Sequence, residues 1–131
     1  MRLSPLLLLV ACAASPGGPS RLERVPNGDW GGEHVRLTVA DTGGKVEFDC
    51  GHGSLDGPLV LDAGGRFDVK GTLVGEGGPV MKDEAARARP ARYHGQSDEE
   101  SMSLEVTLEG GESAGTFSLA RHGRAKLVKC R

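Results

Sequence analysis

The stretch Ser101-Met-Ser-Leu-Glu-Val-Thr-Leu-Glu109 decides the fold class of this chain. Met102, Leu104, Val106 and Leu108 occupy every second position, and polar side chains stand between them. Successive side chains of a β-strand point to opposite faces of its sheet, so strict alternation predicts a strand with one buried and one wet face. The stretch therefore predicts an antiparallel β-protein.

The same two-residue period recurs near residues 35–39, 46–50, 59–61, 67–73, 116–119 and 128–130. Glycine pairs such as Gly43-Gly44 and Gly110-Gly111 separate many of these segments, and glycine accepts the positive φ that tight turns need. The pattern favours an all-β fold, an antiparallel up-and-down meander of seven or eight strands. Such a meander forms a small closed or partly open barrel, because closure removes exposed sheet edges. A two-sheet sandwich is the alternative.

One segment, Val74–Pro90, breaks this pattern. It is longer than ordinary loops, which predicts a functional, mobile or partly helical segment. Residues 82–89 could form two helical turns that end before Pro90.

The N-terminus has the layout of a secretory signal, with Arg2 followed by a short apolar run that ends in small residues. Leu9-Val10-Ala11-Cys12 resembles the lipobox of bacterial lipoproteins, which implies lipidation of Cys12 after cleavage. This predicts a signal peptide over 1–11, a flexible Pro- and Gly-rich tether over 12–26 and one β-domain over 27–131. An ordinary signal cut near Ala14 or Ser15, which would release a secreted protein, is one alternative, and a buried apolar N-terminal strand is another.

The lipoprotein resemblance implies a place in the bacterial cell envelope. Ala13 follows the cysteine, and in the enterobacterial sorting rule a residue other than aspartate there favours the outer membrane, facing the periplasm or the cell surface. The formal net charge of −2 offers no basic surface for nucleic acid. We therefore expect attachment to the membrane through Cys12, no nucleic acid partner, no cofactor and a monomer.

Two further cysteines, Cys50 and Cys130, would remain in the domain. An oxidising envelope favours a disulfide between them, which would tie the C-terminus to the fold. Two free thiols are the alternative. In a closed meander the second and last strands flank the first and lie about 9.6 Å apart, too far for a bridge. The disulfide therefore needs one cysteine at a strand end or bend.

Two polar clusters, Trp30–His34 and Asp49–Asp56, contain side chains that could bind a metal or act as a general base. A metal-dependent enzyme would use Glu33, His34, Asp49 and His52, with Asp56 nearby. Their spacing matches neither H-E-x-x-H nor paired CxxC, and Gly53-Ser54 lacks the G-x-S-x-G pattern of hydrolases. Ordinary turn chemistry explains these residues as well, so we predict no metal site and no enzyme.

Three resemblances follow from short motifs. Gly28-Asp29-Trp30 resembles the opening of calycin barrels, in which the tryptophan ring plugs one end. Phe48-x-Cys50-x-x-Gly53, with the lipobox, resembles membrane-bound inhibitors of C-type lysozyme, small barrel lipoproteins whose Ser/Gly-rich loop ends in Arg-Tyr. Arg92-Tyr93 matches that ending, whereas Arg89-Pro90 replaces the expected Ser and Gly. Trp30-Gly-Gly-Glu-His34 and the stretch Cys50–Pro58 also resemble small exported bacterial proteins of no assigned activity, a resemblance that covers most of residues 28–131.

These observations predict a non-catalytic cell-envelope lipoprotein that acts as a binding or structural module. An inhibitor of lysozyme-type hydrolases is the alternative, with Arg92 and Tyr93 as partner-binding residues; otherwise these two residues start a strand, Tyr93 packing at the barrel rim. Ligands of this class could be proteins or small molecules. A solid interior would exclude the small-molecule option. The residues predicted to fill the interior are Phe48, Phe67, Met102, Leu104, Val106 and Phe117.

Overall fold

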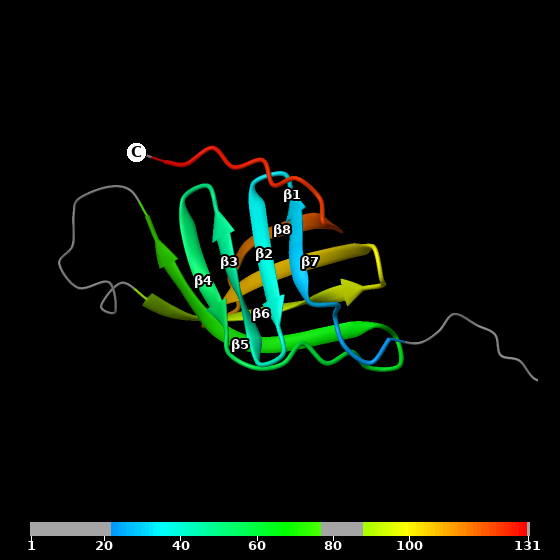
Figure 1. The fold of residues 1–131 in the computed structure, drawn as a ribbon. Helices are drawn as coiled ribbons and strands as arrows, with labels where there is room; N and C mark the ends of the chain where they lie inside the picture. Colours follow the sequence, from blue (N-terminus) through cyan, green and yellow to red (C-terminus); the bar gives the residue numbers. More distant parts are fainter. Residues whose placement is uncertain (1–21, 77–87, 131) are drawn as a thin grey trace, which may run out of the picture.

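A computed structural model describes residues 22–76 and 88–130, and these residues form an all-β barrel (Figure 1). Eight antiparallel strands follow one another in an up-and-down meander, and the last pairs with the first. Among the described residues, no helix is long and apolar enough to cross a membrane. The strands are β1 (Gly28–Gly32), β2 (Val35–Ala40), β3 (Gly43–Phe48), β4 (Gly51–Leu55), β5 (Arg66–Gly75), β6 (Ala88–Ser97), β7 (Ser101–Leu108) and β8 (Ser113–Arg121). The barrel prediction is thus confirmed, and the sandwich is not formed.

Two-residue turns set the register of the first hairpins. Gly32 pairs with Val35, and Ala40 pairs with Gly43. The alternation then places Val35, Leu37 and Val39 inside the barrel with an exposed residue after each. Because side-chain direction has a period of two, these short turns bring the apolar faces of β2 and β3 to the same interior.

The core fills most of the barrel interior. Of the residues predicted to line it, Phe67, Met102, Leu104 and Val106 are buried. Phe48 and Phe117 are only partly buried and pack against the edge of the core. The interior is therefore solid except near these two rings.

One end of the barrel, which we call the closed end, is plugged by apolar side chains. Trp30 is fully buried, and its indole N–H donates a hydrogen bond to the carbonyl oxygen of Pro26 at 3.0 Å. Val25, Leu59 and Leu61 are buried beside the same core. This corrects two predictions: residues 22–26 pack on the domain instead of extending the tether, and 59–61 form no strand.

The described segment before β1, residues 22–27, is held to the domain by backbone hydrogen bonds. The Val25 N–H donates to the Leu59 carbonyl oxygen, and the Leu61 N–H donates to the Glu23 carbonyl oxygen. The rest of the predicted tether, residues 12–21, lies outside the described residues, as does Cys12.

Strand β4 was not predicted, and β6 was anticipated only as the strand that Arg92 and Tyr93 would start, because the apolar residues of these strands do not alternate. Tyr93 on β6 lies inside the barrel over β4 and β5, where a Cβ at Gly53 would collide with its hydroxyl group. Ala88 and Arg89 belong to β6, which corrects the helix expected over 82–89; residues 82–87 of that range lie outside the described residues. Pro90 is tolerated because the pairing of β6 with β7 starts at the next residue, Ala91.

The end of the chain was expected to form a strand at residues 128–130. Instead, residues 122–130 form an irregular C-terminal strap that runs across the ends of β1 to β4 (Figure 1). Backbone hydrogen bonds join Lys126 to Gly32 and His34, and join Cys130 to Asp49. The strap crosses the opposite end of the barrel, and we call this end the open end.

Candidate functional site

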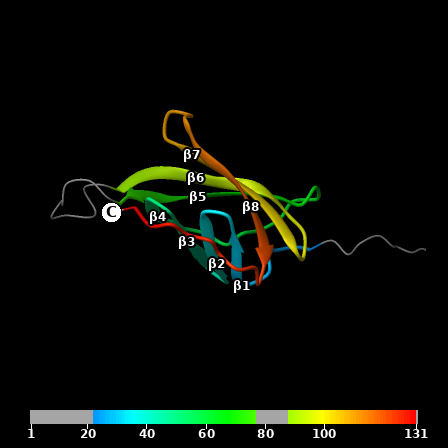
Figure 2. The same ribbon diagram turned by 90° about the horizontal axis from the view of Figure 1, so that it is seen from above.

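The open end carries an incomplete contact between the first and last strands. β8 pairs with β7 from Ser113 to Ala120, but it pairs with β1 only through Leu119, Ala120 and Arg121. Seen from above, the hairpin of β7 and β8 projects away from the layer of β1 to β4 (Figure 2). The barrel therefore splits on this side, between β8 and the turns that follow β1 and β3.

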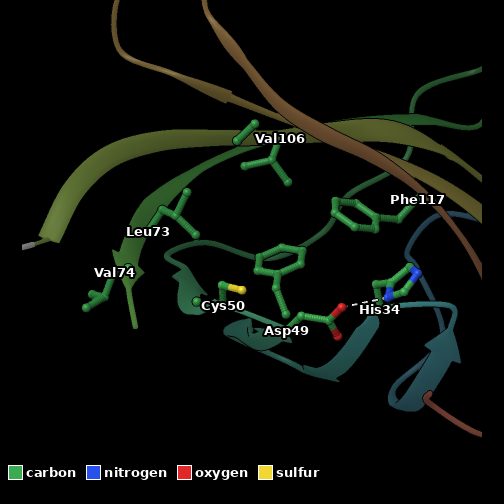
Figure 3. A pocket seen from close by; sticks show the side chains of 11 residues that line it. His34, Asp49, Cys50, Leu73, Val74, Val106 and Phe117 are labelled. Carbon is green, nitrogen blue, oxygen red and sulfur yellow. Dashed lines mark hydrogen bonds and ion pairs between the residues drawn. The ribbon is translucent and has the colours of Figure 1, made fainter. Parts of the chain in front are cut away.

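A pocket of about 320 Å³ lies in this split, and we call it the seam pocket. Most of its wall is apolar, and the rings of Phe48 and Phe117 meet there with their centroids 4.9 Å apart. Figure 3 shows Leu73, Val106 and Phe117 around the pocket, with His34 and Asp49 together at one edge. The lining residues are His34, Phe48, Asp49, Cys50, Gly51, Leu73, Val74, Gly75, Val106, Ala114 and Phe117.

Two turns bring His34 and Asp49 together at the edge of the pocket. The Nδ1 atom of His34 lies 2.6 Å from Oδ2 of Asp49 (Figure 3). The other oxygen, Oδ1, accepts the backbone N–H of Val128 at 2.8 Å. The Val128 N–H lowers the pKa of Asp49 most, and the bond to His34 adds to this effect, so Asp49 is ionised at neutral pH.

His34 also has a left-handed backbone with φ of 70°. It occupies the second position of the two-residue turn between β1 and β2. A position with positive φ favours glycine or asparagine, and a histidine there carries conformational strain. The bond to Asp49 and the backbone bond from His34 N–H to the Lys126 carbonyl oxygen hold it in place.

A second histidine–carboxylate pair stands on the other side of the β3–β4 hairpin. His52 Nδ1 lies 2.6 Å from Oε2 of Glu76, and the ammonium group of Lys129 lies 2.9 Å from Oε1 of Glu76. Lys129 also donates to the Phe48 carbonyl oxygen at 2.7 Å. The Lys129 bond is the main cause of the lowered pKa of Glu76, and the His52 bond contributes as well.

A disulfide between Cys50 and Cys130 fastens the strap to the wall of the seam pocket. The two Cα atoms lie 5.0 Å apart, within the usual range for a bridge. The prediction of this pair is confirmed. The predicted distance problem does not arise, because Cys50 lies in the β3–β4 turn and Cys130 in the strap.

Of the residues proposed for a metal site, His34 and Asp49 meet, but Glu33, His52 and Asp56 do not join them. His34 pairs with Asp49 and His52 with Glu76, whereas Glu33 forms an ion pair with Lys126 at 3.4 Å. Asp56 follows β4 toward the closed end and accepts the Ser54 hydroxyl at 2.8 Å. Across residues 22–76 and 88–130, no three His, Cys, Asp or Glu side chains are placed to hold a metal ion.

Arg92 and Tyr93, predicted as partner-binding residues, lie at the middle of β6. Tyr93 is fully buried, and its hydroxyl group donates a hydrogen bond to the Thr72 carbonyl oxygen at 2.6 Å. Burial, with a smaller effect of Asp56, raises the pKa of Tyr93. Arg92 is half exposed and pairs with Asp68 at 2.8 Å. The expectation that Tyr93 contacts a partner, and the alternative that it packs at the rim, are both wrong, because the ring belongs to the core.

Sequence reasoning singled out His34, Phe48, Asp49, Val106 and Phe117, but not as one site. Leu73, Val74 and Ala114 were missed as lining residues. They come from the end of β5 and the start of β8, and no local pattern shows that these ends meet. Comparisons with protein-family models, curated proteins and solved structures found no match to this chain.

Proposed function

We propose that this chain is a non-catalytic binding module of a bacterial cell envelope, tethered to the outer membrane by a lipid at Cys12. The lipobox-like Leu9–Cys12 supports the tether. The seam pocket supports the binding role and is the observation on which the proposal depends. An apolar recess beside an otherwise solid core removes bound apolar groups from water, which is the main source of affinity in pockets of this kind.

The chemistry around the pocket favours binding over catalysis. Both oxygens of Asp49 are already engaged, by His34 and by the Val128 N–H. Cys50 is held in a disulfide, so it offers no thiolate. The polar groups at this edge thus hold the wall of the pocket together, and the apolar side chains are what a ligand would meet.

The volume of the pocket sets the size of the group that fits. About 320 Å³ lies at the lower limit of ordinary ligand pockets, roughly 300–1,000 Å³. A single aromatic ring or a short branched aliphatic group fits this space. The lysozyme-inhibitor hypothesis has less support, because its Tyr93 is buried in the core.

Propylbenzene provides a direct test of the pocket. In ¹H–¹³C NMR spectra of the purified domain, we expect its titration to shift the methyl signals of Leu73 and Val106, which line the pocket. The methyl signals of Leu37 in the core should stay in place. Ala114→Phe should block the effect by filling the recess, whereas Ser113→Phe, next to it and outside the pocket, should not. Saturable shifts that are equal in both variants would refute this site.

The tether is tested separately. Expression of the full chain in a bacterium with labelled palmitate should label the protein and place it in the membrane fraction. Cys12→Ser should remove the label and release the protein. If neither form is labelled and both are soluble, the lipoprotein part of the proposal is wrong, whatever the pocket binds.

A further inference from the structure

The strand that borders the seam pocket has an unpaired edge. On the side of β8 away from β7, residues 113–118 pair with no strand among the described residues, because β1 covers only Leu119–Arg121. The Ser118 carbonyl oxygen lies so close to Gly32 that no side chain fits there, so Ser118 directs its backbone groups toward β1. Alternation along the strand then directs the N–H and C=O of Thr116 to the same open side.

Such an edge is unusual in a barrel, since closure normally pairs every strand on both sides. Thr116 is exposed, so its edge is accessible to a partner. Unpaired backbone donors and acceptors in a row are the template on which an extended peptide adds as a further strand.

The pocket lies beside this edge, and β8 itself lines it through Ala114 and Phe117. In an extended peptide, alternate side chains point to opposite faces. A peptide paired along Thr116 would therefore direct every second side chain toward the barrel, where one apolar side chain could enter the seam pocket beside Phe117 and Leu73. Backbone hydrogen bonds would give affinity, and the recess would select the side chain.

The open end carries an excess of acidic side chains, and this charge favours a basic partner. It carries Glu47, Asp49, Glu76, Glu109 and Glu112, and the lowered pKa values of Asp49 and Glu76 keep both ionised. Besides the mutually neutralising Glu33–Lys126 pair, the cations that pair with these acids in the described chain are Arg36, Lys129 and Arg89, so five carboxylates face three cations. A basic peptide is complementary to this end.

We propose that the free edge of β8 binds an extended, basic segment of another protein as an additional strand, with one apolar side chain in the seam pocket. This inference rests on the proposed function, because it names the class of partner for the same pocket. It goes further in placing the main recognition on backbone groups of β8.

The test uses an N-acetylated, C-amidated nonapeptide in which lysine alternates with valine and one central valine is replaced by phenylalanine. We expect saturable binding to the folded domain, with slower hydrogen exchange at the Thr116 amide in the complex. N-methylation of the peptide on the edge that faces β8 should weaken binding by about fivefold or more for each hydrogen bond removed. The same peptide with glutamate in place of lysine should bind more weakly still, and added salt should reduce this difference.

A variant of the protein provides the second arm. Thr116→Pro removes the N–H that faces the open side and leaves the pairing with β7. It should therefore lower the affinity for the peptide by a factor similar to that of N-methylation. Thr116→Val keeps this N–H, so it serves as the control and should bind normally. If Thr116→Pro does not fold, the methylated peptides still decide the question.

Binding that is insensitive to N-methylation, without protection of Thr116, would overturn the inference. So would a dimer of the free domain in sedimentation that protects the same amide, because a second copy would then occupy the edge. Propylbenzene binding in either case would leave the proposed function standing. If propylbenzene does not bind but the peptide binds normally, the seam pocket is refuted as a ligand site, whereas the edge of β8 is supported as a peptide site.

Discussion

The two ends of this barrel both carry aromatic and aliphatic side chains, but these side chains are buried to different degrees. At the closed end, Trp30 and Val25 are almost wholly buried, and the last three residues of β8 pair with β1. At the open end, Phe48 and Phe117 are only partly buried, and β8 runs on beyond the last residue of β1. The difference arises from length: β1 has five residues and β8 has nine. A short first strand can close only part of a barrel, and the uncovered part becomes a pocket.

The largest difference between the ends should appear in stability. Trp30→Ala removes a fully buried ring and its hydrogen bond to Pro26, so we expect a loss of about 3–5 kcal/mol in the free energy of unfolding. That is a large part of the roughly 5–15 kcal/mol typical of a domain. Urea denaturation followed by circular dichroism would measure it.

The matched change at the open end is Phe117→Ala. Because Phe117 is partly exposed and borders a pocket, we expect a loss of only about 1 kcal/mol, with weaker binding of propylbenzene. Equal losses for the two substitutions would show that the open end is packed as tightly as the closed end, contrary to the comparison.

The second prediction concerns the disulfide, which fastens the open end alone. Cys50→Ser with Cys130→Ser opens a link across 80 residues of sequence, and we expect a loss of about 2–4 kcal/mol. The released segment belongs to the open end, so amide hydrogen exchange should accelerate most in the strap and the β3–β4 hairpin, and the Trp30 amide should accelerate no more than the loss of global stability requires. Uniform acceleration would mean that the strap supports the whole barrel.

Local patterns in the sequence predicted most of the strands, but they did not predict the seam pocket. Alternation identified β2, β3, β5, β7 and β8, because the apolar period directly reflects a one-sided core. It failed at Gly53 on β4, whose lack of a side chain accommodates Tyr93 on β6. The seam pocket depends on where the pairing of β1 with β8 stops, and that depends on contacts between residues that are far apart in the sequence. No local pattern encodes this, so the pocket could not be predicted.

The smallest expected effect is a pH dependence that belongs to the open end. Lys129, and then His52, lower the pKa of Glu76 below its ordinary value of 4.5. A carboxyl group with a lowered folded-state pKa stabilises the fold above its unfolded pKa, and this contribution is lost as the pH falls through the folded-state pKa. Glu76→Gln should therefore be less stable than the wild type at pH 6, and the difference should shrink between about pH 4.5 and pH 3.

The strap provides the control, because it positions Lys129 beside Glu76 through the Cys50–Cys130 bond. In a Lys129→Met background, Glu76→Gln should change the stability at pH 6 far less than it does in the wild type. Reduction of the disulfide should diminish the effect of Glu76→Gln in the same direction, since a released strap no longer holds the ammonium group in place. Urea midpoints of the wild type, the two single variants and the double variant from pH 3 to pH 6 would measure this. A Glu76 contribution that is unchanged after reduction would show that the strap stays docked without its covalent link, and that the open end is stiffer than its incomplete pairing suggests.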